Sequence, residues 1–171
     1  IYTLRIEQYV EAMSGIQRLE QMPVQITECK YSVLRSELED TAKLLAGALH
    51  LSLIVPDSGT VQLDHGLFLT VAENLIGNAA RFAQSSLIIC LEDLGDYLLL
   101  TVTDDGPGYP AELVQNGPKP FGKMKEDAAH FGMGLYSSQT LCLKHGGNLK
   151  LKNENDHGAT VTASFQIKWK P

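Results

Sequence analysis

Three short segments place amide, carboxylate and glycine residues at spacings that suit a charged ligand. In the first, Asn74 and Asn78 lie four residues apart and share one face of a helix, with Arg81 three residues further on. Asparagine is a poor helix former, so two on one face suggest a polar ligand. An amide oxygen can bind Mg²⁺, and an arginine can neutralise phosphate. Taken by itself, the pattern also fits a solvated polar face.

The second segment runs from Asp104 to Gly108 and follows a predicted strand directly. A carboxylate there can accept a hydrogen bond from an exocyclic amine, which is how carboxylates recognise bases. The two glycines allow positive φ and close approach of the backbone to a ligand. A plain turn is the alternative, because Asp-Gly and Pro-Gly are common turn formers.

The third segment, Gly132 to Leu135, precedes a predicted helix. Glycines at a helix start expose backbone N–H groups where the helix dipole favours anions. The segment lacks both the Lys-Ser/Thr ending of a P-loop and a full GxGxxG pattern. Gly158 to Thr160, before the last predicted strand, indicates only a turn.

Hydrophobic periodicity predicts the elements that must position these residues. The predicted helices span Ser36–Ala46, Gly66–Arg81 and Leu135–His145. For the first, Ser36 is the expected N-cap with Glu39 completing a capping box, and Gly47 ends it. The predicted strands are Val24–Val33, Leu49–Val55, Val61–Leu63, Ser86–Asp93, Tyr97–Asp104, Asn148–Asn153 and Ala159–Lys168. We therefore expect a two-layer α/β sandwich, with one mixed sheet and helices on one face.

Two other stretches are distinctive. Tyr2 to about Gln21 reads as a helix ended by Pro23, with a coiled-coil-like apolar seam. It fits either a helix packed on its own domain or half of a helical hairpin.

Gly106 to about Gly132 is a long irregular stretch, of the kind that is functional or mobile in compact domains. His145 lies at a predicted helix C-terminus, where a positive charge is favoured.

The length and composition of the chain exclude several classes of protein. The 171 residues, 44% of them hydrophobic, suit one globular domain. A net charge of −6 argues against non-specific nucleic-acid binding. No apolar run approaches the ~20 residues of a membrane helix. The three cysteines show no metal-binding spacing and fit buried thiols in a reducing compartment. Because the chain begins at Ile1, we expect it to be part of a longer protein.

In their order and spacing, the segments resemble the ATP-binding domain of sensor histidine kinases, within the GHKL ATPase superfamily. Asn74–Phe82 resembles the asparagine box, Asp104–Gly108 the first glycine box and Gly132–Leu135 the second. Phe121 stands where the F box is expected, and Gly158–Thr160 resembles the final glycine-threonine element. The resemblance covers about residues 25 to 168 and implies the GHKL (Bergerat) fold.

The resemblance also implies roles. Asp104 would bind the adenine amino group with Thr160 supporting it through water, and Asn78 would coordinate Mg²⁺. Asn74 would take the catalytic position, where other members of the family carry Glu or Asn. Glu73 lies one residue earlier, about 100° off the Asn78 face. Residues 110 to 131 would form a lid, from which Lys123 or Lys125 reaches the γ-phosphate. The other ATP-binding residues implied are Arg81, Phe82, Gly106, Gly108, Gly132, Gly134 and Leu135.

Residues 1–22 resemble the end of the second helix of a dimerisation hairpin, leaving 23–171 as the ATP-binding domain. None of the five histidines resembles the phosphoacceptor, which would lie on the missing first helix. The resemblance implies Mg-ATP binding and γ-phosphate transfer to that histidine for relay to a response regulator. It also implies a homodimeric full-length protein with this domain in the cytoplasm, attached to an inner-membrane sensor. The alternatives are an anti-sigma-factor-type serine kinase and a degenerate nucleotide-binding or scaffold module.

Overall fold

The structure is a computed structural model that describes residue 18 and residues 21–119 and 126–169, without the side chains of 126–133. The predicted helix of Tyr2 to Gln21 lies almost entirely outside the described residues. Phe121, Lys123 and Lys125 lie outside them as well.

A five-stranded mixed sheet forms one layer, in the order β2-β4-β5-β7-β6. The strands are β2 (His50–Ile54), β4 (Ser86–Asp93), β5 (Tyr97–Asp104), β6 (Leu149–Asn153) and β7 (Ala159–Gln166). Only β2 and β4 pair in parallel, and the other neighbours are antiparallel. Alternate residues of β5 and β7 are buried, as expected for strands with one covered face. The bounds of β4 and β5 are those that the sequence predicts.

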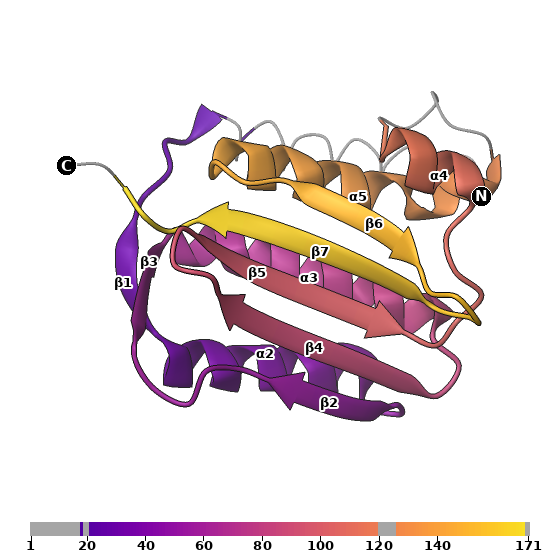
Figure 1. The fold of residues 1–171 in the computed structure, drawn as a ribbon, viewed down its shortest axis with the longest axis horizontal. Coiled ribbons are helices and arrows are strands. Elements are labelled where there is room, and N and C mark those ends of the chain that lie inside the picture. The colour runs from indigo at the N-terminus through magenta and orange to yellow at the C-terminus, as the bar shows by residue number, and fades with distance from the viewer. Residues whose placement is uncertain (1–17, 19–20, 120–125, 170–171) are drawn as a thin grey trace.

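Three helices cover one face of this sheet (Figure 1): α2 (Tyr31–Ala46), α3 (His65–Phe82) and α5 (Glu126–Lys144). The central helix, α3, buries Leu67, Phe68, Val71, Ala72, Leu75, Ile76 and Ala79. These residues recur at helical spacing, and each large one contributes about 1.5–3 kcal/mol by leaving water. The Asp64 side chain caps α3 by accepting a hydrogen bond from the Leu67 N–H at 3.1 Å. The predicted α/β sandwich with helices on one face is confirmed.

The N-terminal part of the domain differs from the sequence prediction. Strand β1 covers only Thr27–Lys30 and pairs with β3 (Thr60–Leu63) in a separate two-stranded sheet. Helix α2 begins at Tyr31, so Ser36 lies inside it and the predicted Ser36–Glu39 cap is wrong. The buried residues Tyr31, Leu34 and Leu38 explain the earlier start, because their spacing gives the helix an apolar face from its first residue.

The stretch predicted as irregular contains helical structure. Helix α4 (Ala111–Asn116) lies within it, and Leu113 anchors that helix in the core. Helix α5 begins at Glu126, nine residues before the predicted start at Leu135. The second glycine segment therefore lies inside a helix in this structure, and the lid predicted for residues 110–131 contains α4 and the first residues of α5.

Candidate functional site: the end of strand β5 and the asparagine face of helix α3

The C-terminal end of β5 meets the C-terminal end of α3 at one edge of the domain (Figure 1). Gly106, two residues beyond β5, lies against the last residue of α3. A Cβ on Gly106 would stand 2.2 Å from the Phe82 carbonyl oxygen. Since no real Cβ approaches so closely, only glycine fits. Asn78 lies one turn before Phe82, so the first glycine segment and the asparagine segment share one end of the fold.

Asp104, the last residue of β5, continues the buried face of that strand and is only 6% exposed. Its Oδ1 accepts a hydrogen bond from the Gly106 N–H at 2.8 Å. Burial raises the pKa of Asp104, and the nearby Asp105 charge adds to the rise. Hydrogen bonds from the backbone of Gly106 and Ala159 act in the opposite direction. A desolvated carboxylate with free lone pairs is suited to binding a donor from a ligand.

The next residue, Asp105, has a different role. Its carboxylate accepts hydrogen bonds from the backbone N–H groups of Gln84, Ser85 and Ser86 and from the Ser85 hydroxyl. These bonds hold its pKa well below the usual range. Asp105 thus fastens the α3–β4 connection to the end of β5.

After Gly106, the backbone of Gly108 and Tyr109 is held by the side chain of Asn153. Gly108 has φ +90°, a conformation that favours glycine, and its backbone passes close to Asn153 at the end of β6. The Asn153 side chain makes two hydrogen bonds to Tyr109. Its Oδ1 accepts from the Tyr109 N–H at 2.7 Å, and its Nδ2 donates to the Tyr109 carbonyl at 2.9 Å.

The predicted α3 side chains differ in their surroundings. Asn78 is partly exposed and has no hydrogen-bond partner among the described residues. The exposed Arg81 places its guanidinium 5.5 Å from the centre of the Phe82 ring. Asn74 donates from Nδ2 to the Ser137 Oγ of α5 at 3.0 Å, and that hydroxyl donates to the Gly134 carbonyl at 3.2 Å.

Gly132 and Gly134 lie within α5, and Leu135 is fully buried. In this structure the N–H groups of these residues are part of a helix interior, so the expectation of a helix N-terminus at this segment is wrong here. A Cβ on Gly134 would meet nothing within 4 Å. The α5 backbone therefore has no steric need for glycine at this position.

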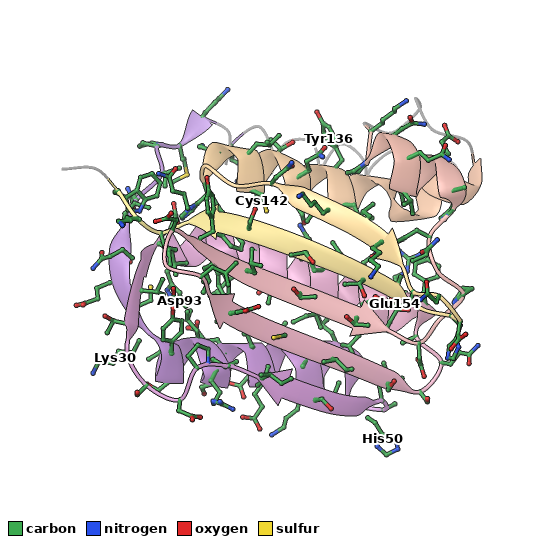
Figure 2. The ribbon with its side chains drawn as sticks, in the orientation of Figure 1. Lys30, His50, Asp93, Tyr136, Cys142 and Glu154 are labelled. Carbon is green, nitrogen blue, oxygen red and sulfur yellow. The ribbon has the colours of Figure 1, made fainter. Side chains whose placement is uncertain are left out.

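The predicted partnership of Thr160 with Asp104 is wrong. Asp104 pairs with Ala159 across β5 and β7, whereas Thr160 pairs with Thr103 and faces the open side of the sheet. The Thr160 hydroxyl donates to the Glu154 Oε1 at 2.6 Å and lies 3.1 Å from the Thr103 hydroxyl. Glu154 is labelled in Figure 2 in the β6–β7 turn. Alternate strand residues face opposite sides of the sheet. Thr160 follows Ala159 by one residue, so its hydroxyl lies on the face opposite to Asp104.

His145 is fully buried rather than a charged helix terminus. Its Nε2 accepts a hydrogen bond from the Asp64 N–H at 2.9 Å, so that nitrogen carries no proton. Burial lowers the pKa of His145, although the Asp64 charge opposes the shift. The expectation of a positive charge here is wrong because desolvation outweighs the helix dipole.

Residues 64–168 match the family of histidine kinase-, DNA gyrase B- and HSP90-like ATPases. The matched range contains both glycine segments and the whole asparagine face of α3. The chain belongs to this family. The domain is of the ATP-binding catalytic type found in sensor histidine kinases, as the family match and the relatives below indicate.

Among these relatives, the sensor protein kinase PilS of Pseudomonas aeruginosa is 29% identical over 124 residues, covering 68% of this chain and 23% of that protein. The sensor histidine kinase RegB of Cereibacter sphaeroides is 33% identical over 101 residues, covering 54% of this chain and 21% of that protein. The chain thus spans about a fifth to a quarter of these relatives. The structure of full-length ShkA, in complex with AMPPNP, superimposes on 96% of this chain and 36% of that one with a TM-score of 0.74 and 18% identity.

In the part of the chain that the structure describes, no helix combines the length and the apolar composition that crossing a membrane requires.

Proposed function

We propose that this chain is the catalytic domain of a sensor histidine kinase, which binds Mg-ATP and transfers the γ-phosphate to a histidine on the dimerisation hairpin. The observation that carries the proposal is Asp104. It is a buried carboxylate at the end of β5, beside a glycine backbone that is packed on the asparagine helix. The family assignment and the similarity to the sensor kinases PilS and RegB support the same function.

In this proposal the chain's own residues bind and orient the nucleotide. Asp104 accepts a hydrogen bond from the adenine amino group, and the Gly106 N–H holds the carboxylate in place. Arg81 is exposed at the same end of α3 and can reach phosphate. Such positioning and charge neutralisation account for most of the catalysis of phosphoryl transfer. Asn74 is proposed as the polar group nearest the transfer.

The residues present fit a magnesium ion held mainly by the nucleotide. No group of three or more His, Cys, Asp or Glu side chains among the described residues forms a metal site. The Asn78 amide has no hydrogen-bond partner among those residues and can offer its oxygen. Mg²⁺ typically takes one or two protein ligands together with phosphates and water. When bound, the ion would neutralise charge on the transferred phosphate.

The remaining parts of the proposal concern the full-length protein. We propose that residues 1–22 end the dimerisation hairpin, that the protein acts as a homodimer and that a response regulator receives the phosphate. The domain would work in the cytoplasm, where ATP is available, as part of an inner-membrane sensor. A serine kinase of the anti-sigma-factor type is not favoured, since the relatives PilS and RegB are sensor kinases.

Calorimetric titration with AMPPNP, with and without Mg²⁺, tests the nucleotide part of the proposal. Binding at micromolar to sub-millimolar concentration that Mg²⁺ strengthens is the expected result. Absence of binding at millimolar nucleotide would instead favour a degenerate scaffold module.

Incubation with labelled ATP and the separately expressed hairpin of the full-length protein tests the transfer. We expect label on the hairpin that is lost in acid and retained in alkali, as for phosphohistidine. Acid-stable label on a serine would contradict the histidine kinase and support the rival class.

A further inference from the structure

Outside the residues assigned above, the Asn153 side chain contacts the backbone that follows the glycine segment. Asn153 ends β6, the edge strand of the sheet, and contacts Tyr109, which lies 44 residues away in the sequence. The two hydrogen bonds use both backbone groups of Tyr109, the N–H and the carbonyl. A neighbouring strand would satisfy one residue in the same way. The Asn153 amide therefore extends the sheet beyond the last residue of β6.

The register of the sheet places this amide level with the site. Asn153 pairs with Ala159, and Ala159 pairs with Asp104. The carboxylate and the amide thus stand at the same level on β5 and β6, separated by β7. The segment from Gly106 to Tyr109 is fixed at both ends, by Asp104 at its start and by Asn153 at its finish.

The position of the Asn153 amide also accounts for glycine at residue 108. A Cβ on Gly108 would lie 2.9 Å from the Asn153 Oδ1, closer than real Cβ atoms approach. Gly108 therefore leaves space for the amide in addition to adopting φ +90°. Tyr109 follows and is only 5% exposed, so packing also fixes this backbone.

We propose that Asn153 is a positioning residue for the adenine end of the nucleotide site. It holds the segment from Gly106 to Tyr109 in the shape that receives the base, without contacting the nucleotide. The proposal rests on the proposed function, because it assumes that Asp104 and the glycine segment bind adenine. Since the phosphates lie elsewhere, loss of Asn153 weakens all adenine nucleotides equally and leaves the effect of Mg²⁺ unchanged.

The test compares Asn153→Ala with Asn155→Ala, a matched change two residues along the chain. Asn155 is exposed and has no hydrogen-bond partner among the described residues. Calorimetry with ADP in EDTA and with Mg-AMPPNP gives the affinities. Asn153→Ala is expected to raise both dissociation constants about tenfold, the loss expected for two partly exposed hydrogen bonds. Asn155→Ala should change neither, and the ratio of affinities with and without Mg²⁺ should stay as in wild type.

Two further readouts separate positioning from general damage. Amide hydrogen exchange should speed up at Tyr109 in Asn153→Ala while the centres of β5 and β7 stay protected. Asn153→Asp keeps the shape and the acceptor but replaces the Nδ2 donor, so it should also weaken both nucleotides even if Asn153→Ala proves unstable. Wild-type affinity in a folded Asn153→Asp or Asn153→Ala variant would overturn the inference. If wild-type protein binds no nucleotide, it is the proposed function that fails.

Discussion

At the scale of single residues, the adjacent Asp104 and Asp105 have opposite effects on the stability of the folded state. Asp104 is buried and its pKa is raised mainly by desolvation, so its charge is costly to the folded state. Asp105 is held by four neighbouring donors and its pKa is lowered. A group that lowers the stability of a fold is usually retained for function, which supports binding as the role of Asp104.

The change Asp104→Asn should leave the domain folded and weaken AMPPNP binding about 10- to 100-fold. This range corresponds to a hydrogen bond to a charged group of about 1.5–3 kcal/mol. Calorimetry on the folded variant measures it. Asp96→Asn, an exposed carboxylate in the β4–β5 turn, is the control and should bind normally. Wild-type affinity in Asp104→Asn would remove Asp104 from the site.

Asp105→Asn should act on stability instead. The folded-state pKa of Asp105 is lowered, so its stabilisation is present above the unfolded pKa of 3.8 and is lost as the pH falls below it. The variant should therefore have a lower Tm than wild type at pH 7, and the difference should shrink in acid. Thermal unfolding between pH 7 and pH 3 measures both. A constant Tm difference across this range would contradict the linkage.

At the scale of elements, α5 continues through a segment that the resemblance assigns to phosphate binding. Gly134 has no steric role in this helix, yet glycine costs a helix about 0.5–1 kcal/mol relative to alanine. The Ser137 hydroxyl links the Gly134 carbonyl to Asn74 on α3, so the segment is held next to the asparagine face. A glycine with no role in the helix is expected to serve a second conformation, in which its N–H group contacts the nucleotide.

Gly134→Ala should therefore stabilise the domain by about 0.5–1 kcal/mol and weaken AMPPNP binding several-fold. Gly77→Ala is a matched control, since Gly77 lies inside α3 with ordinary space beside Leu45. Both variants should raise the Tm, and only Gly134→Ala should lose affinity in calorimetry. Equal affinities for the two variants would show that Gly134 has no role in binding.

At the scale of the whole molecule, His145 joins parts of the domain that are remote in sequence. It accepts from the backbone of Asp64 at the start of α3 and contacts the Phe165 ring edge-on, with centroids 5.5 Å apart. The Trp169 ring also packs on it, at 5.7 Å. Because these contacts come from α3, β7 and the C-terminal residues, protonation of His145 would disturb the packing of several elements together.

Since burial lowers the folded-state pKa of His145, its contribution to stability is complete above the unfolded pKa of 6.5 and decreases as the pH falls below it. Wild-type protein should lose free energy of unfolding between pH 7 and pH 5. His145→Gln keeps an acceptor for the Asp64 N–H and does not titrate, so its pH dependence in this range should be weaker. Parallel pH profiles in urea unfolding would contradict the assignment.

The sequence by itself determined the fold class and the family. Alternation of apolar residues predicts β4 and β5 with their observed bounds, and helical spacing predicts α3 to within one residue at each end. The order of the asparagine and glycine segments predicts the family, which the match over residues 64–168 confirms. These features are local because a strand or helix repeats its pattern within a few residues.

Only the tertiary structure decided which groups meet. Asp64 and His145 lie 81 residues apart and Tyr109 and Asn153 lie 44 apart, so no local pattern indicates either pair. Pairing register, and not the motif, placed Ala159 beside Asp104 and Thr160 on the opposite face. Packing against the core likewise set the charge of His145 and the start of α2. Long-range contacts depend on how the helices pack against the sheet. Several packing arrangements satisfy the same local spacing, and the free energy of burial selects among them.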